Sequence, residues 1–145
     1  MKRNLYTFFE GAWVFSRFCH SHQISKEPYT LVYQGKAQFN PIDEVTLSYE
    51  ELSATSDNKE SPLDAYQIRR YEFNAEKEFE ASVSYEDGRL IHQLDLVRGY
   101  WCFNHYCGDD VYQGTYRVLN DISFEVTWIV LGPRKKYTLY SLYKR

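Results

Sequence analysis

The stretch Ile122–Leu131 has the sequence ISFEVTWIVL, which alternates between apolar and other residues with a period of two. Its large apolar side chains occupy every second position: Ile122, Phe124, Val126, Trp128 and Val130. An α-helix would repeat its apolar residues about every 3.6 positions, whereas successive side chains of a β-strand point to opposite faces. The stretch is therefore predicted to be a strand with one buried face.

The same alternation continues along the chain, filled by Tyr, Phe, Val, Ile, Thr and Trp, which suit a pleated sheet. It predicts about ten strands, at residues 10–19, 31–39, 44–52, 64–74, 78–85, 89–97, 99–106, 111–119, 122–131 and 136–143. The clearest hairpin is at Asp87-Gly88, because a two-residue turn needs the positive φ that Asp-Gly adopts easily. The polar stretches 20–28 and 53–62 are predicted to be loops.

Regularly spaced strands joined by short turns predict an up-and-down meander, which closes on itself to remove its exposed edges. The predicted fold class is therefore all-β, a single antiparallel barrel of about eight to ten strands. The length of 145 residues suits one domain, so residues 1–145 are expected to form it. A barrel of this width keeps an internal cavity, which is the natural place for a ligand.

Composition and charge exclude several classes of protein. A hydrophobic share of 43% excludes a disordered chain. The net charge of -3 lacks the basic excess that binding to a phosphate backbone requires, so no nucleic acid is expected as a partner. No apolar run reaches the roughly 18–20 residues that span a bilayer, and the N-terminal stretch lacks a signal-peptide cleavage site. Membrane insertion and export are therefore not expected.

The three cysteines, Cys19, Cys102 and Cys107, cannot all pair with one another. An odd count in a chain without an export signal favours free thiols over a disulfide framework. Reduced thiols fit the cytoplasm, so we expect a soluble cytoplasmic protein.

Arg17 shares a strand face with Trp13 and Phe15 and is predicted to point into the cavity. A buried guanidinium needs a planar or anionic partner. One alternative is a ligand carboxylate or phosphate. The other is an internal ion pair with Glu51 or Asp110.

His92, His105, Cys107 and Asp110 belong to the residue types that bind zinc. Only His105-x-Cys107 forms a close pair, whereas strong zinc signatures contain two, so no metal site is predicted. An inward histidine in a barrel could also serve as an axial haem ligand, but no cofactor is assigned from the sequence.

The same residues suggest a nucleophilic site, in which His105 or His92 activates Cys107 and Asp110 orients the imidazole. Side chains at i and i+2 of a strand are about 6–7 Å apart, which is long for a direct contact. The alternative is a satisfied polar network of His105, Asp110 and Tyr112. A one-residue bulge at Gly108-Asp109 is predicted, which would bring Asp110 and Tyr112 to the side of His105.

The turn Gly132-Pro133-Arg134-Lys135 places two cations beside a glycine. It is either an anion-binding turn, with Arg134 contacting the ligand, or a strand connection whose charges point to water.

Several spaced motifs occur together in the chain: G-x-W-x-F-x-R at 11–17, D-G-R-x-x-H at 87–92, H-x-C-x-x-D-x-Y at 105–112 and G-P-R-K at 132–135. The set resembles a lipocalin-like family of the calycin superfamily, made of small intracellular proteins of unknown function. The resemblance covers essentially the whole chain and implies a barrel with a pocket, but no reaction. In calycins the tryptophan of G-x-W packs at the closed end against a basic side chain, which implies a pair of Trp13 with Arg145 or Arg134.

The predicted function is to bind a small amphiphilic or planar ligand in the barrel cavity. Eight residues are predicted to contact it: Arg17, His92, His105, Cys107, Asp110, Tyr112, Trp128 and Arg134. Two alternatives remain, a small enzyme that uses the His/Cys/Asp/Tyr cluster for acid–base chemistry and a protein-interaction module with a filled interior. The identity of the ligand and the oligomeric state do not follow from the sequence.

Overall fold

The computed structural model describes residues 4–22, 27–55 and 67–145, in which a short helix, α1 (Leu5–Phe9), precedes ten strands. The strands are β1 (Gly11–Ser21), β2 (Tyr29–Pro41), β3 (Thr46–Thr55), β4 (Gln67–Phe73), β5 (Glu80–Tyr85), β6 (Leu90–Asp95), β7 (Tyr100–Cys107), β8 (Asp110–Asn120), β9 (Ser123–Leu131) and β10 (Lys136–Lys144). Each predicted strand matches one of these, with ends that differ by a few residues. The all-β prediction is confirmed.

The two predicted loops are shorter than expected where the structure describes them. β1 runs to Ser21 and β3 runs to Thr55, so both strands extend into the predicted loops. Residues 23–26 and 56–62 of these predictions lie outside the described residues, as does the predicted start of the fourth strand at 64–66.

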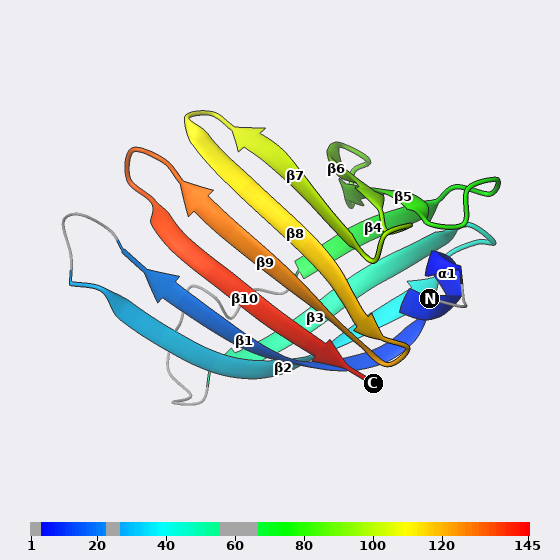
Figure 1. Ribbon diagram of the computed structural model, residues 1–145, viewed down its shortest axis with the longest axis horizontal. Coiled ribbons are helices and arrows are strands. Elements are labelled where there is room, and N and C mark those ends of the chain that lie inside the picture. The colour runs from blue at the N-terminus through cyan, green and yellow to red at the C-terminus, as the bar shows by residue number, and fades with distance from the viewer. Residues whose placement is uncertain (1–3, 23–26, 56–66) are drawn as a thin grey trace.

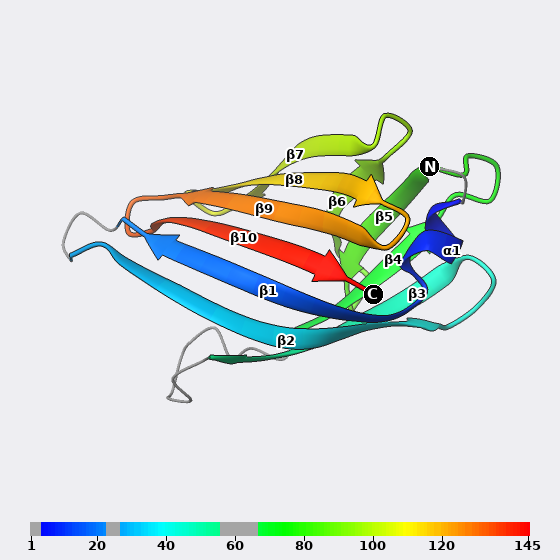
Figure 2. The ribbon, with the colours of Figure 1, turned by 60° about the horizontal axis from the view of Figure 1, so that its bottom comes forward.

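All ten strands form one antiparallel sheet in the order β6-β5-β4-β3-β2-β1-β10-β9-β8-β7. Every neighbour is also a neighbour in sequence except β1 and β10, which pair and place the first strand beside the last (Figures 1 and 2). The up-and-down meander is therefore confirmed, and the sheet curls into a nearly closed barrel. No helix in the described parts of the chain has the length and apolarity to cross a bilayer.

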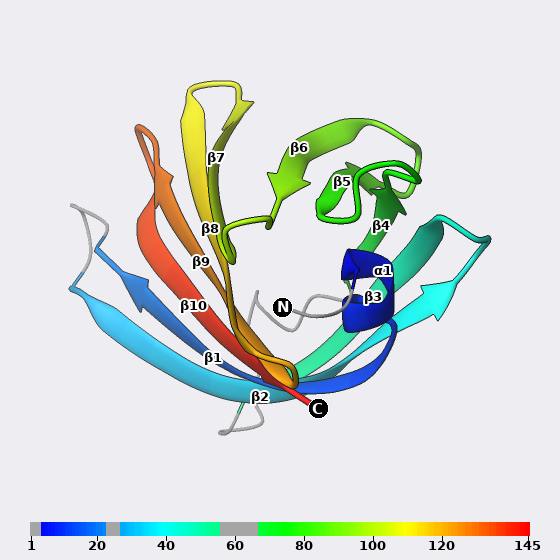
Figure 3. The same cartoon turned by 45° about the vertical axis from the view of Figure 1, so that its right-hand side comes forward.

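The barrel is closed between β6 and β7 by side chains instead of a backbone ladder. These strands follow one another in the chain and face each other in Figure 3, but they are the two edges of the sheet. The Trp101 indole donates to the Gln93 carbonyl at 3.1 Å, and His105 Nδ1 donates to the Ile91 carbonyl at 3.0 Å. The predicted removal of exposed edges is thus achieved partly by side chains from β7.

One end of the barrel is sealed by α1, a helix that the alternating pattern did not predict. Phe8 and Phe9 of this helix are fully buried, and the Trp13 indole donates to the Phe9 carbonyl at 2.8 Å. The Arg145 guanidinium lies 4.0 Å over the Trp13 ring and donates to the Phe8 carbonyl at 2.5 Å. The pair implied by the resemblance is therefore Trp13 with Arg145, not with Arg134.

The inner face predicted from alternation is confirmed on β1, where Trp13, Phe15 and Arg17 are buried in turn. His92 lies on the apolar side of β6, as expected, and is buried. Ile122 was predicted to share the buried face of the strand with Phe124. It lies before the start of β9 and is exposed, so this part of the prediction is wrong.

The predicted bulge at Gly108-Asp109 is wrong. Cys107 pairs with Asp110 and His105 pairs with Tyr112, so Gly108-Asp109 is a two-residue turn without a register shift. Residues that pair across a two-residue turn lie on the same face of the sheet, although one has an odd and the other an even sequence number. His105 and Tyr112 are such a pair, so no bulge is needed to place them on the same face.

Candidate functional site

The barrel encloses a cavity of about 300 Å³, which is at the lower end of the range for small-molecule sites. Its wall takes side chains from both halves of the sheet. Seven tyrosines of the described residues contribute to it: Tyr49, Tyr71, Tyr85, Tyr112, Tyr116, Tyr137 and Tyr143. Aromatic faces and hydroxyl groups therefore dominate the interior.

Six of the eight predicted site residues line the cavity: Arg17, His92, His105, Cys107, Tyr112 and Trp128. Asp110 and Arg134 are not part of the wall. The Asp110 carboxylate pairs with Lys135 Nζ at 3.3 Å, and Arg134 is exposed in the connection between β9 and β10. Both lie near the β7–β8 and β9–β10 turns, beyond the stretch of strand that faces the interior.

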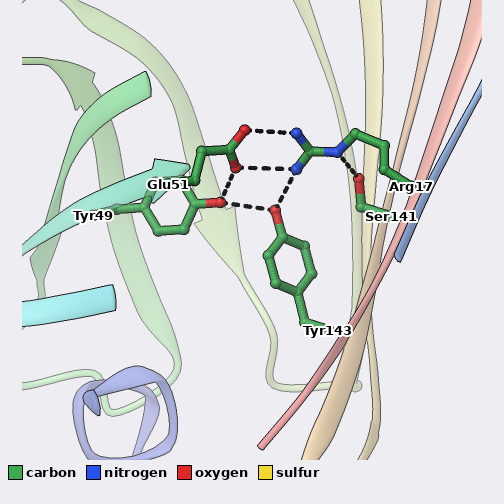
Figure 4. Close-up of polar contacts among 5 residues, drawn as sticks. All are labelled: Arg17, Tyr49, Glu51, Ser141 and Tyr143. Carbon is green, nitrogen blue, oxygen red and sulfur yellow. Dashed lines mark hydrogen bonds and ion pairs between the residues drawn. The ribbon is translucent and has the colours of Figure 1, made fainter. Parts of the chain in front are cut away.

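A buried ion pair joins Arg17 of β1 to Glu51 of β3 across the cavity wall (Figure 4). Arg17 Nη1 donates to Oε1 at 2.6 Å and Nη2 donates to Oε2 at 3.0 Å. Arg17 Nε donates to Ser141 Oγ at 2.6 Å, and Nη2 also donates to Tyr143 Oη at 2.9 Å. Of the alternatives for Arg17, the internal pair with Glu51 is the one that the structure shows.

The protons of this network can be assigned because a carboxylate only accepts and a guanidinium only donates. Tyr49 donates its hydroxyl proton to Glu51 Oε2, and Tyr143 therefore donates to Tyr49 Oη, 2.8 Å away. Burial raises the pKa of Tyr143 to about 12, so its hydroxyl keeps the proton at neutral pH. The network is internally satisfied, with four of the five Arg17 N–H groups engaged.

A second polar pair spans the interior between β4 and β8. The hydroxyls of Tyr71 and Tyr116 are 2.6 Å apart, and burial raises the pKa of both. One hydroxyl donates to the other, which leaves one proton of the pair available to another acceptor.

His92 is held in one protonation state and one orientation. Its Nδ1 lies 2.9 Å from the Gln93 carbonyl, which can only accept, so Nδ1 carries the proton. Burial lowers the pKa of His92 to about 4, helped by the nearby His105 and Arg69. At neutral pH the ring is therefore uncharged, and Nε2 presents a lone pair.

The ring of His92 is stacked on Phe103, with centroids 3.7 Å apart and planes 10° from parallel. Phe103 in turn lies on Gly114 of β8, where a Cβ would come within 2.3 Å of Phe103 Cζ. Trp128 meets Phe103 edge to face at 5.1 Å. Gly114 thus provides the space that lets this aromatic group assemble beside the cavity.

The predicted network of His105, Asp110 and Tyr112 is not formed. His105 uses Nδ1 for the Ile91 carbonyl, and its Nε2 lies 3.5 Å from the Tyr85 hydroxyl. Lys135 donates to Tyr112 Oη at 3.2 Å and pairs with Asp110, so the lysine takes the place expected of the histidine. Lys135 was expected to bind an anion or to point to water, and its contacts with Asp110 and Tyr112 were not predicted, because the sequence does not show that the β9–β10 turn lies beside β8.

The predicted nucleophilic cluster is also not assembled. Cys107 is exposed at the rim of the cavity, and no hydrogen bond joins it to either histidine within the described residues. Within the same part of the chain, no three side chains of His, Cys, Asp and Glu gather as they would around a metal ion.

Comparisons with known proteins place the chain by fold and family. Among solved structures, S-type phycobiliprotein lyase CPES from Guillardia theta has a TM-score of 0.65 at 8% identity, over 99% of this chain and 93% of that one. Rv2717c from M. tuberculosis has a TM-score of 0.55 at 12% identity, over 97% and 94%. EF1p2_mFAP2b bound to DFHBI has a TM-score of 0.51 at 10% identity, over 98% and 97%. At these identities the likeness shows a shared barrel fold.

No curated protein sequence matches the chain. The model of a family of unknown function, DUF6314, matches residues 9–145. This match begins beside the Gly11-x-Trp13 motif and runs through Arg145, so it includes the whole barrel and both members of the Trp13–Arg145 pair. The chain therefore belongs to the DUF6314 family of unknown function.

Proposed function

We propose that this protein binds a small, planar and largely apolar ligand inside the barrel. The observation that supports this most directly is the cavity of about 300 Å³ with its wall of aromatic side chains. Small-molecule sites combine an apolar lining with a few polar groups that fix the orientation of the ligand. Here the polar groups include the Tyr71–Tyr116 pair, His92, Arg69 and the Arg17 network.

The aromatic wall favours a planar ligand, and the Arg17 guanidinium does not call for an anionic one. The guanidinium of Arg17 already has its counter-ion in Glu51 and needs no anion from a ligand. Flat aromatic groups such as Trp128 and Tyr116 offer stacking and edge contacts to a ring. A barrel of the same fold, EF1p2_mFAP2b, was solved bound to the small molecule DFHBI, which supports the use of this architecture for such a role.

We also propose that residues 1–145 form one lipocalin-like domain that works in the cytoplasm. The seal of α1, Trp13 and Arg145 at one end supports the lipocalin-like assignment. The cysteines Cys19, Cys102 and Cys107 are free thiols, which supports a reducing compartment.

Native mass spectrometry of protein purified gently from cells, compared with the denatured sample, tests the binding function. The wild type is expected to retain an extra mass. Val126→Phe fills the cavity and is expected to abolish it, whereas Ile129→Phe, on the outer face of the same strand, is expected to retain it. Equal retention by both variants, or a bare polypeptide mass together with no thermal shift from any planar compound, contradicts the proposal.

Acid–base catalysis is a second candidate, and the observation in its favour is His92, an imidazole with a strongly lowered pKa inside the cavity. An imidazole with a pKa of about 4 is a weak base at neutral pH, and the partners expected for it, Cys107 and Asp110, do not contact it. Turnover of a bound compound that disappears in His92→Phe would favour this candidate over simple binding.

A further inference from the structure

One polar atom of the cavity wall, Nε2 of His92, has no hydrogen-bond partner among the described residues. His92 is only 5% exposed, and its Nε2 forms no hydrogen bond with any described residue. Among the described residues, every fully covered side-chain nitrogen or oxygen has a hydrogen-bond partner. Nε2 is therefore not covered by protein, and it opens to the cavity that His92 lines.

The orientation of this atom is set before any ligand arrives. The hydrogen bond from Nδ1 to the Gln93 carbonyl and the stacking of the ring on Phe103 together fix the orientation of the imidazole. The Gln93 carbonyl also accepts from Trp101, which ties this contact to the closure of the barrel. A fixed acceptor contributes more to binding than a mobile one, because less freedom is lost when the ligand binds.

The tautomer decides which ligand group can bind there. With the proton on Nδ1, the neutral ring offers only a lone pair at Nε2. A ligand carboxylate, carbonyl or ether oxygen would place a second lone pair against it. The nearby Arg69 and His105 help to keep the imidazole from taking up a proton. The matching group is an O–H or an N–H donor.

We infer that His92 Nε2 is the hydrogen-bond acceptor for the ligand, so the cavity selects planar ligands that carry an O–H or N–H donor on the ring. This inference rests on the proposed binding function. The Trp128 and Tyr116 rings, which lie beside His92 and line the cavity, then bury the ring of the ligand. A phenol or a ring N–H can donate to Nε2, whereas a ligand whose polar atoms are all acceptors leaves Nε2 without a partner.

Isothermal titration calorimetry with two matched probes, 2-naphthol and 2-methoxynaphthalene, tests the inference. They share the planar ring, and only the first has a donor. The wild type is expected to bind 2-naphthol about tenfold more tightly, the affinity that one well-placed hydrogen bond supplies. His92→Phe keeps an aromatic ring on Phe103 and is expected to remove that preference. His20→Phe, at the outward-facing His20 of β1, is the matched control and is expected to keep it.

A second measurement does not depend on a variant that folds. In ¹⁵N NMR of the wild type at neutral pH, saturation with 2-naphthol is expected to shift the Nε2 resonance of His92 while Nδ1 stays protonated. Saturation with 2-methoxynaphthalene is expected to leave the Nε2 resonance in place.

The outcomes separate the two proposals. Equal affinity of the wild type for both probes, a preference that persists in His92→Phe, or an unmoved Nε2 resonance at saturation with 2-naphthol overturns the inference and leaves the binding function standing. Failure of the wild type to bind either probe contradicts the proposed function itself, and the inference falls with it.

Discussion

Arg17 and Glu51 face each other inside the barrel as a two-point ion pair, with Nη1 and Oε1 2.6 Å apart. They belong to β1 and β3, which are separated in the sheet by β2. The side chains are 5% and 2% exposed, so neither charge has access to bulk water. In such a place each charge is tolerated only because the other one neutralises it.

Replacing one member of this pair is expected to be costly. Arg17→Met leaves Glu51 charged and buried without its partner, and the free energy of unfolding is expected to fall by about 3–5 kcal/mol. The double variant Arg17→Met with Glu51→Met removes both charges and is expected to recover most of that loss. Urea unfolding of the three proteins measures both effects. A loss below about 1 kcal/mol in the single variant would show that the ion pair is not desolvated.

The Arg145 side chain is expected to stabilise the sealed end of the barrel. Arg145→Ala removes the cation from the Trp13 ring and the hydrogen bond to the Phe8 carbonyl, with an expected loss of about 1–3 kcal/mol. Arg134→Ala, at an exposed arginine, is the control and is expected to change stability by less than about 0.5 kcal/mol. Thermal unfolding measures both, and equal effects of the two variants would contradict the role of the seal.

Gly114 is expected to be needed for the stack of Phe103 on His92. A methyl group there would overlap the Phe103 ring, so Gly114→Ala is expected to cost about 1–3 kcal/mol. Adding Phe103→Leu makes room and is expected to recover part of the loss, whereas Gln113→Ala, on the outer face, is expected to be neutral. Unfolding midpoints check this order, and a neutral Gly114→Ala would refute the overlap.

His92 is expected to make stability depend on pH. Its pKa is about 4 in the folded chain, below the ordinary value of 6.5, so the unfolded chain binds more protons between these two values. Stability is therefore complete above about pH 6.5 and falls as the pH decreases toward 4, by about 3 kcal/mol in total.

The difference between wild type and His92→Phe isolates this contribution, because the other titrating groups are common to both. Chemical unfolding at pH 7 and at pH 5 measures it, and the wild type is expected to lose more stability than the variant. Parallel curves for the two proteins would mean that the imidazole of His92 is not desolvated in the folded state.

Much of the fold could be predicted because strand patterning is local. The alternation of Phe124, Val126 and Trp128 requires one buried face whatever surrounds the strand, and ten strands were found where the pattern indicated them. The helix α1 has five residues, too few to show a helical period, and it forms where its buried phenylalanines pack against the barrel. Its existence depends on contacts that the local sequence does not contain.

The site was predicted less completely than the fold. Alternation placed Arg17 and His92 inside, because a side chain's face follows from its position on the strand. It could not choose between Glu51 and Asp110 as the partner of Arg17, since both lie far from Arg17 in the sequence. The Tyr71–Tyr116 pair was missed for the same reason: its members come from strands on different parts of the barrel.

Periodicity and turn chemistry along the chain were enough to predict the strands, their inward faces, the meander and the candidate histidines and arginine. The tertiary structure alone decided which groups are satisfied and which are free. It neutralised Arg17 with Glu51, tied His105 to a carbonyl of β6, and left Nε2 of His92 open to the cavity. Which polar groups form hydrogen bonds and ion pairs depends on the distances between side chains across the barrel, and these distances are set when the sheet curls.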